Sequence, residues 1–179
     1  SGSSTLTGGA GDDSIVGNHA RVHGPDDETY RYPYFIGSSN DVLNGGTGDD
    51  QIYFDLADTV TGGAGADELT GYADVGQTSV VTDFTAGEDV LTVNLEPTTE
   101  AGTISDFANV TVVEQDGNTL IQISGSDVVR IEGATGLSVG YEVGNPSTGM
   151  PPTYTDLDGN PVDAASLDVV INNFEYFVH

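Results

Sequence analysis

Hydrophobic residues are distributed differently in the two parts of the chain. Up to about residue 75 they mostly occur singly among glycines and acidic residues, whereas from about residue 80 they form short runs rich in Val, Ile and Leu. A single aliphatic residue flanked by polar ones predicts a very short strand with one buried side chain. The later runs are typical of longer strands. We therefore expect an all-β protein whose two parts are built differently.

Three nine-residue segments in the first part share the pattern GGxGxDxUx, in which U is a large aliphatic residue. They begin at Gly8, Gly45 and Gly62. The glycines permit a tight turn with positive φ, and the xUx residues at the end of each unit form a short strand. One unit cannot bury its aliphatic side chain alone, so successive units must stack, with two units in each coil.

The spacing of these repeats predicts on which side of the coil each turn lies. Their first glycines are 37 and 17 residues apart. This fits a coil of about 18 residues, with an insertion of about 19 residues at roughly 18–37. The three strong turns therefore fall on one side of the coil. Two weaker copies, which end in Asp41 and Asp58, fall on the other side.

The second part of the chain reads as strands and turns. Five segments with β-branched residues are predicted strands, at residues 80–84, 89–95, 110–113, 119–123 and 128–131. Asp116-Gly117 lies between two of them and predicts a hairpin. Residues 145–162 read as a loop, in which Asp156 to Asn160 favours a hairpin turn over the start of an EF-hand. Leu167–Val178 predicts a final strand, which we expect to be free for assembly.

The charge of the chain excludes several classes of partner. It has 29 acidic and 3 basic residues, a net charge of -26 and no cysteine. Nucleic acids and anionic bilayers are bound through Lys and Arg, so neither is an expected partner. No apolar run approaches the ~18 residues of a membrane span, and thiolate metal sites are excluded. Because the repeats hold few hydrophobic residues, a bound cation is the economical source of their folding energy.

The acidic turns offer the oxygen ligands that calcium prefers, namely carboxylates and carbonyls. With the strong turns on one side, we expect ions between Asp13 and Asp50 and between Asp50 and Asp67. Asp41 and Asp58 are candidates for a further ion on the opposite side, with a solvated turn as the alternative. Asp83 and Asp89 flank a turn at Gly87 and are candidates to close the last site.

These repeats resemble the RTX nonapeptide repeats of bacterial proteins exported by type I secretion, which form a calcium-binding parallel β-roll. The segments from Val81 to Leu91 and from Asn118 to Gly133 also resemble the region after the roll in serralysin-like C-terminal domains. The resemblance implies calcium ligation by the carbonyls of positions 1 and 3 and the carboxylate of position 6, with position 5 often Asn or Asp. Carried over, these are Gly8, Ala10 and Asp13, then Gly45, Thr47 and Asp50, then Gly62, Ala64 and Asp67, with Asp12, Asn40 and Asp49 at position 5. Ala66 departs from the pattern.

The fold we expect is a short parallel β-roll followed by an antiparallel β-sandwich-like cap. Residues 1–79 form the roll with its inserted loop, residues 80–144 the cap, and residues 145–179 a loop and a C-terminal strand. The roll is expected to bind about two to five Ca²⁺ ions. No catalytic motif such as HExxH or GxSxG is present, so we do not expect an enzyme.

The expected function is that of an extracellular module that folds on calcium binding after export. It would belong to a secreted or cell-surface structural or adhesive protein, such as an S-layer, adhesin or fibre subunit. One alternative is the non-catalytic C-terminal module of a secreted protease or lipase. Another is a carbohydrate-binding module that uses the insertion, which holds four of the chain's aromatic residues and two of its arginines. A loop that packs over the roll is the simpler interpretation of this insertion.

Overall fold

Two β-sheets contain nearly all the regular structure of the residues that the structure describes. The computed structural model describes residues 3–17, 40–95, 109–143 and 151–173. In this part of the chain the longest helical segment is a 3₁₀ turn at Ala164–Ser166, and no helix is long and apolar enough to cross a bilayer. The all-β prediction is confirmed.

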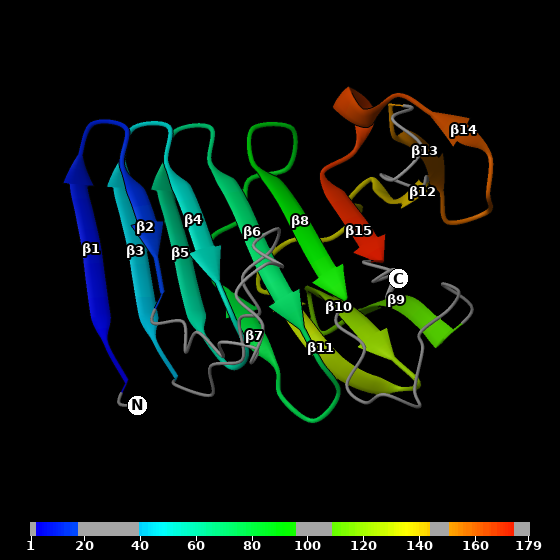
Figure 1. Cartoon of the computed structure of the whole chain (residues 1–179), viewed down its shortest axis with the longest axis horizontal. Helices are drawn as coiled ribbons and strands as arrows, with labels where there is room; N and C mark the ends of the chain where they lie inside the picture. Colours follow the sequence, from blue (N-terminus) through cyan, green and yellow to red (C-terminus); the bar gives the residue numbers. More distant parts are fainter. Residues whose placement is uncertain (1–2, 18–39, 96–108, 144–150, 174–179) are drawn as a thin grey trace, which may run out of the picture.

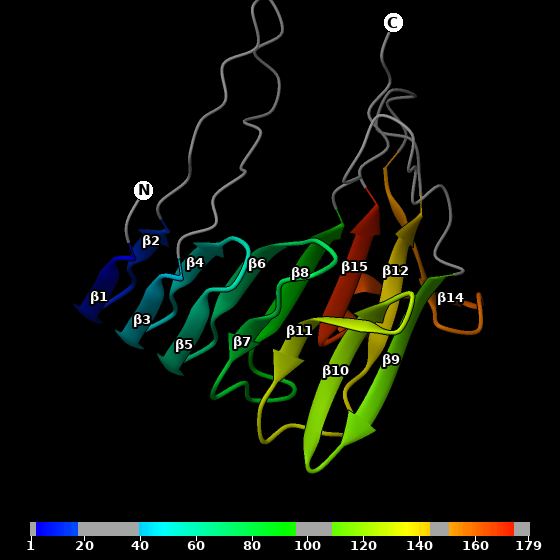
Figure 2. The ribbon, with the colours of Figure 1, turned by 90° about the horizontal axis from the view of Figure 1, so that it is seen from below.

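The first strands form a parallel β-roll. Each coil gives one strand to each sheet, so that odd-numbered strands form one wall and even-numbered strands the other (Figures 1 and 2). All neighbouring strands in both walls are parallel. The coils are β1 (Thr5–Ala10) with β2 (Ser14–Val16), β3 (Val42–Thr47) with β4 (Gln51–Phe54), β5 (Thr59–Ala64) with β6 (Glu68–Ala73), and β7 (Ser79–Val81) with β8 (Val90–Leu95).

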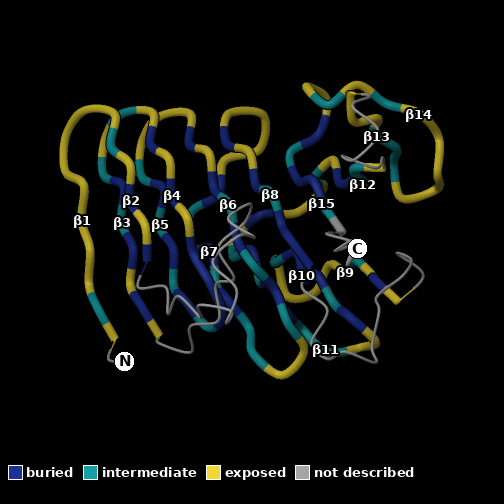
Figure 3. The backbone as a smooth tube through the Cα atoms, in the orientation of Figure 1, coloured by how far each residue is buried: buried dark blue, intermediate teal, exposed yellow. Residues whose placement is uncertain are grey.

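The aliphatic residue of each repeat points into the space between the two walls, as its position in the pattern predicts. Ile15, Ile52 and Leu69 are in register with one another and are 7%, 0% and 1% exposed. The facing wall contributes Leu43 and Val60, which are fully buried. Figure 3 shows buried stretches along the strands of the roll. Each wall therefore contributes a single layer of side chains to the core of the roll. This is a small amount of apolar burial for so acidic a chain.

The cap continues both walls of the roll. In one sheet β7 is followed by β11 (Ser126–Ile131), β10 (Asn118–Ile123) and β9 (Val110–Gln115), of which the last three are antiparallel. Asp116 and Gly117 have φ of 53° and 80°, which is the geometry of a type I′ hairpin turn. In the other sheet β8 is followed by β15 (Val169–Asn173), β12 (Val139–Val143), β13 (Thr153–Asp156) and β14 (Pro161–Val162). The prediction of a β-sheet cap after the roll is confirmed, and the strands that join it to the roll, β11 on one wall and β15 on the other, are parallel to their neighbours in the roll.

The C-terminal strand occupies an interior position, so the expectation that it is free for assembly is wrong. β15 (Val169–Asn173) lies between β8 and β12 and is parallel to both. Val169 and Ile171 are fully buried. A continuous apolar run such as Val169-Val170-Ile171 suits a central strand, where both faces are covered. The chain thus closes its cap by inserting its last described strand beside the last coil of the roll.

Candidate metal centre

Four carboxylates form a ladder along the side of the roll that holds the strong turns. The backbone N–H of Asp13 donates to Oδ1 of Asp50 at 2.8 Å, and that of Asp50 donates to Oδ1 of Asp67 at 2.9 Å. The N–H of Asp67 donates to Oδ1 of Asp89 at 3.0 Å. We call Asp13, Asp50, Asp67 and Asp89 the first carboxylate ladder. The prediction that the three strong turns share one side is confirmed, and Asp89 extends their series by one.

The second carboxylate oxygen of each repeat Asp, Oδ2, has different surroundings from Oδ1. Oδ2 of Asp13, Asp50 and Asp67 is buried, and no described residue offers it a hydrogen bond. A buried carboxylate oxygen without a donor is costly unless a cation neutralises it. Three equivalent oxygens in this state, one on each strong turn, indicate positions for bound cations.

Each of these oxygens faces the first glycine of its own repeat and, in two of the three turns, a backbone carbonyl of the next coil. A Cβ atom placed on Gly8 would lie 2.5 Å from Asp13 Oδ2 and 2.7 Å from the carbonyl oxygen of Gly45. A Cβ on Gly45 would collide with Asp50 Oδ2 and the Gly62 carbonyl in the same way. Glycine therefore keeps a small space open between a carboxylate oxygen and a carbonyl oxygen. This donor set fits calcium, which takes carboxylate and carbonyl ligands.

The remaining residues carried over from the repeat pattern have partners within the turns. The carbonyl oxygens of Thr47 and Ala64 accept hydrogen bonds from Gly11 and Gly48 at 2.7 and 2.8 Å, which leaves each carbonyl one lone pair for an ion. The position-5 carboxylates connect successive coils, because Asp12 accepts from the N–H of Asp49, and Asp49 accepts from the N–H of Ala66. Within the described residues no three acidic or histidine side chains converge on one point. Any ion here must therefore draw on carbonyls as well as carboxylates.

A second carboxylate ladder runs along the opposite side of the roll and consists of Asp41 and Asp58. The N–H of Ser4 donates to Asp41 Oδ1 at 2.6 Å, and the N–H of Asp41 donates to Asp58 Oδ1 at 2.8 Å. Asp41 and Asp58 are 1% and 0% exposed, so the alternative of a solvated turn is wrong. Their Oδ2 atoms lie 3.6 and 3.3 Å from where a Cβ on Gly17 would be, which brings both toward the same point.

Sequence reasoning missed Asp55, which is fully buried beside the second ladder. Its N–H donates to Asp58 Oδ2 at 2.9 Å, and its carbonyl accepts from the hydroxyl of Ser79 at 2.8 Å. The weak repeat copy from Phe54 to Thr61 lacks one residue, so Asp55 has no counterpart in the nonapeptide pattern. The only signal was a second acidic residue three positions before Asp58.

Burial and like charge make Asp58 a weak acid. Removal from water raises its pKa from 3.8 to about 7, against the lowering effect of the N–H groups of Asp55 and Asp41, and the charges of those two residues raise it further. Burial also raises the pKa of Asp67 and Asp89 on the first ladder, with a contribution from neighbouring carboxylates. In a protein without a bound cation, both sides of the roll therefore resist full ionisation.

This behaviour predicts that acid partly substitutes for calcium. The folded-state pKa of Asp58, about 7, lies above the ordinary value of 3.8, so the folded chain binds this proton more tightly than the unfolded chain does. Its stabilisation is complete below the ordinary value and is lost as the pH rises through about 7. In calcium-depleted buffer we expect circular dichroism to show more β-structure at pH 5 than at pH 8. Asp58→Asn should weaken this dependence, and equal responses of the two proteins would contradict the assignment to Asp58.

Asp83 and Asp89 close the end of the roll in two different ways. Both oxygens of Asp83 accept hydrogen bonds at 2.9 Å, from the N–H groups of Gly62 and Gly63 in the last strong turn. Asp89 accepts from Asp67 through Oδ1 and from the N–H of Thr85 through Oδ2 at 2.7 Å. Asp83 thus satisfies the turn backbone, whereas Asp89 occupies the place that the Asp of a further repeat would take.

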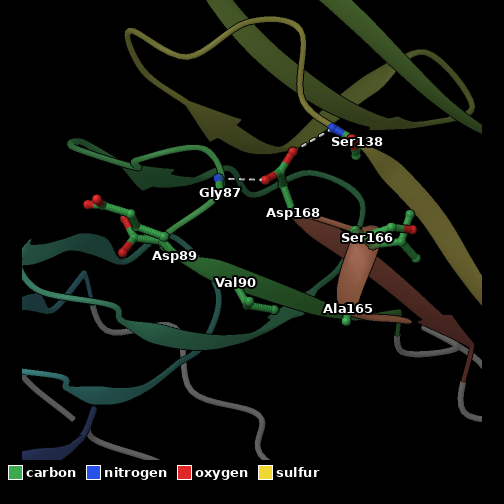
Figure 4. Close-up of a pocket in the computed structure, with 9 residues that line it drawn as sticks. Gly87, Asp89, Val90, Ser138, Ala165, Ser166 and Asp168 are labelled. Atoms are coloured by element: carbon green, nitrogen blue, oxygen red, sulfur yellow. Dashed lines mark hydrogen bonds between the residues drawn. The ribbon is translucent and has the colours of Figure 1, made fainter. Parts of the chain in front are cut away.

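The turn at Gly87, which closes the roll, is bound to the cap through Asp168, a residue that the sequence pattern did not single out. Oδ1 of Asp168 accepts from the N–H of Gly87 at 2.8 Å, and Oδ2 accepts from the N–H of Ser138 at 2.7 Å (Figure 4). These contacts border a pocket of about 300 Å³ between the turn at Gly87 and the cap. Asp168 directly precedes β15, so the insertion of this strand places the carboxylate against the turn that contains Asp89.

Loss of the Asp168 carboxylate should loosen the end of the roll. Because hydrogen bonds to a charged group contribute about 1.5–3 kcal/mol each, we expect Asp168→Ala to lower the free energy of unfolding in saturating calcium by about 2–4 kcal/mol. Denaturant unfolding measures this change. Asp158→Ala, at an exposed position in the β13–β14 hairpin, is the matched control and should change little. Equal destabilisation by the two substitutions would show that the bridge has no special role.

Comparison with known families agrees with this geometry. A family model of the RTX calcium-binding nonapeptide repeat matches four copies, at residues 1–19, 37–56 and 54–75. Residues 1–75 therefore contain RTX calcium-binding repeats, and the chain contains a calcium-binding module of the kind found in secreted proteins. The RTX repeat is a structural calcium-binding motif rather than a catalytic one. No curated protein matches the chain.

The glycine at the first position of each repeat can be tested directly. Gly45→Ala should place a methyl group in the space shared by Asp50 Oδ2 and the Gly62 carbonyl, and so exclude one ion without changing the charge. Native mass spectrometry should then show one calcium ion fewer than in the unmodified chain. Gln51→Ala, on the exposed face of the adjacent strand, should keep the full number. An unchanged ion count in Gly45→Ala would mean that the ion does not lie there.

Proposed function

We propose that this chain is a module of a secreted or cell-surface protein that folds when it binds calcium outside the cell. The observation that carries this proposal is the series of buried Oδ2 atoms of Asp13, Asp50 and Asp67, each without a hydrogen-bond donor among the described residues. A net charge of -26 opposes compaction, and the roll has only a thin apolar core. Binding free energy from calcium would then be folding free energy.

In this proposal the ligands on the first side are the carboxylates of Asp13, Asp50, Asp67 and Asp89, with backbone carbonyls at positions 1 and 3 of the repeats. Gly8, Gly45, Gly62, Ala10, Thr47 and Ala64 are the residues concerned. Asp12, Asp49 and Asp83 would fix the turns through their hydrogen bonds to backbone N–H groups. Asp41 and Asp58 would bind an ion on the second side. When bound, calcium would neutralise these carboxylates and connect successive coils.

The proposed location follows from the concentration of calcium. The chain would remain poorly folded in the calcium-poor cytosol, which suits export as an extended chain, and would fold at the higher concentration outside. We propose a structural or adhesive role there rather than a catalytic one. The aromatic insertion at about 18–37, on which a carbohydrate-binding role would depend, lies outside the described residues.

A calcium titration tests this proposal. Circular dichroism should report cooperative folding with a midpoint near the 10⁻⁴–10⁻³ M range of extracellular calcium modules, and magnesium at the same concentration should not replace calcium. A midpoint at or below micromolar calcium would contradict the proposal, because the chain would then fold before export.

A further inference from the structure

Asn44 and Gly45 form the only Asn-Gly pair in the chain. They lie in β3, and Gly45 is the first residue of the second strong repeat. Asparagine is among the chemically labile residues of proteins. It reacts fastest before glycine, because a residue without a side chain lets its backbone nitrogen approach the asparagine Cγ. The pair is therefore a site at which the chain can modify its own backbone.

The reaction at this pair needs only water. The backbone nitrogen of Gly45, after loss of its proton, attacks Cγ of Asn44 and expels the side-chain nitrogen as ammonia. Water then opens the resulting five-membered succinimide ring at either of its two carbonyl groups. One product is aspartate. The other is isoaspartate, in which the main chain runs through Cβ and Cγ and is longer by one carbon atom. In sum, an amide and water become a carboxylic acid and ammonia.

The folded roll holds these residues in a geometry that prevents the attack. β3 is an inner strand of its sheet, between β1 and β5. Asn44 and Gly46, on either side of Gly45, are each in register with a residue on both neighbouring strands. To reach Cγ, the nitrogen of Gly45 must rotate about the ψ angle of Asn44 out of the extended range, which would break the ladder on both sides. The reaction therefore proceeds only from opened or unfolded chain.

The turn that follows has no room for a longer backbone. A Cβ atom on Gly45 would collide with Asp50 Oδ2 and the carbonyl oxygen of Gly62, and one on Gly46 would collide with the carbonyl oxygen of Gly9. Aspartate at residue 44 leaves this backbone as it is. Isoaspartate would displace Gly45, and with it the space in which a carboxylate oxygen and a carbonyl oxygen face each other.

We propose that Asn44 is a self-modification site that calcium protects. With calcium, the folded roll keeps Asn44 in an inner strand, and the residue persists. Without calcium, the open chain forms isoaspartate at this position and loses the geometry of the second strong turn, a loss that calcium cannot reverse. Chain that stays without calcium for long thus becomes unable to fold when calcium is restored. The proposal rests on the calcium-dependent folding proposed above.

The test follows the reaction in the full chain in mildly alkaline buffer, with calcium in one sample and excess chelator in the other. Circular dichroism records folding in each sample. Peptide mass spectrometry detects the conversion of the Asn44 amide to an acid, and chromatography separates isoaspartate from aspartate. Because the reaction starts from opened chain, we expect it to be at least about tenfold slower in calcium. After return to calcium, the aged chelator sample should regain β-structure only in molecules without isoaspartate at residue 44.

Two variants separate the change of backbone from the change of charge. Asn44→Gln keeps an amide, but its cyclisation needs a six-membered ring, which forms much more slowly. This variant should therefore refold fully in calcium after the same time in chelator. Freshly prepared Asn44→Asp adds one negative charge without lengthening the backbone, and it should fold in calcium with the same number of ions as the unmodified chain.

Two results would overturn the proposal. Equal rates of reaction at Asn44 in folded and unfolded chain would show that β3 does not protect this residue. Refolding of chain with isoaspartate at residue 44, with an unchanged ion count by native mass spectrometry, would show that the modification leaves the turn intact. A chain that stays folded in chelator would instead contradict the proposed function, and comparison with urea-unfolded chain would then decide whether β3 protects Asn44.

Discussion

Removal of calcium is expected to unfold the roll. The carboxylates of both ladders are closely spaced along the coils, and Asp50, Asp67, Asp89, Asp41 and Asp58 are each less than 5% exposed. Without cations, these charges repel one another in a low-dielectric setting, and the thin core cannot compensate. Circular dichroism in excess chelator at pH 8 should therefore show largely unfolded chain. Millimolar calcium should restore the β-sheet signal.

The same experiment gives the number of ions. Native mass spectrometry in calcium should show about two to five bound ions. Each calcium site in a protein uses 6–8 oxygens, and the oxygens of the two ladders suffice for no more than about five such sites. Sodium at equal ionic strength is the control, because general screening of charge would act equally with either salt. If the chain were equally folded in chelator, or if sodium sufficed, specific calcium binding would not be the source of its stability.

Replacement of Asp50 is expected to be the most damaging single change in the ladders. Asp50 accepts from Asp13 and donates to Asp67, and its Oδ2 faces the Gly62 carbonyl. Asp50→Asn preserves an acceptor for Asp13 but puts an uncharged NH₂ group, which cannot bind a cation, at the other position. We expect the loss of at least one ion and a rise of about tenfold in the calcium midpoint, which corresponds to about 1.4 kcal/mol.

Two controls separate this effect from a general change of charge. Asp116→Asn makes the same substitution in the exposed β9–β10 turn and should leave the midpoint unchanged. Asp41→Asn should have a smaller effect than Asp50→Asn, because the Asp41 carboxylate lies at the end of the short second ladder, where it accepts from Ser4, whereas Asp50 lies between two strong turns. Equal effects at Asp41 and Asp50 would refute the view that the ladder of strong turns dominates binding.

The sequence alone determined the architecture of the roll, because that architecture is periodic. A repeat of GGxGxDxUx sets which residues turn, which point inward and which approach one another in the next coil. The spacing of 37 and 17 residues was therefore sufficient to place Asp13, Asp50 and Asp67 on one side, as their hydrogen bonds show. The hairpin at Asp116-Gly117 was equally predictable, because a two-residue turn depends on local conformation alone.

Outside the regular repeats, the tertiary structure decided which side chains come into contact. Asp55 lies in a copy with a missing residue, and although its contact with Asp58 is local, its burial and its hydrogen bond from Ser79 depend on the stacked coils. Asp168 meets Gly87, 81 residues earlier in the chain, because β15 inserts between β8 and β12 rather than pairing at an edge. Such contacts depend on which strands pair over long sequence distances, and hydrophobic pattern does not specify this.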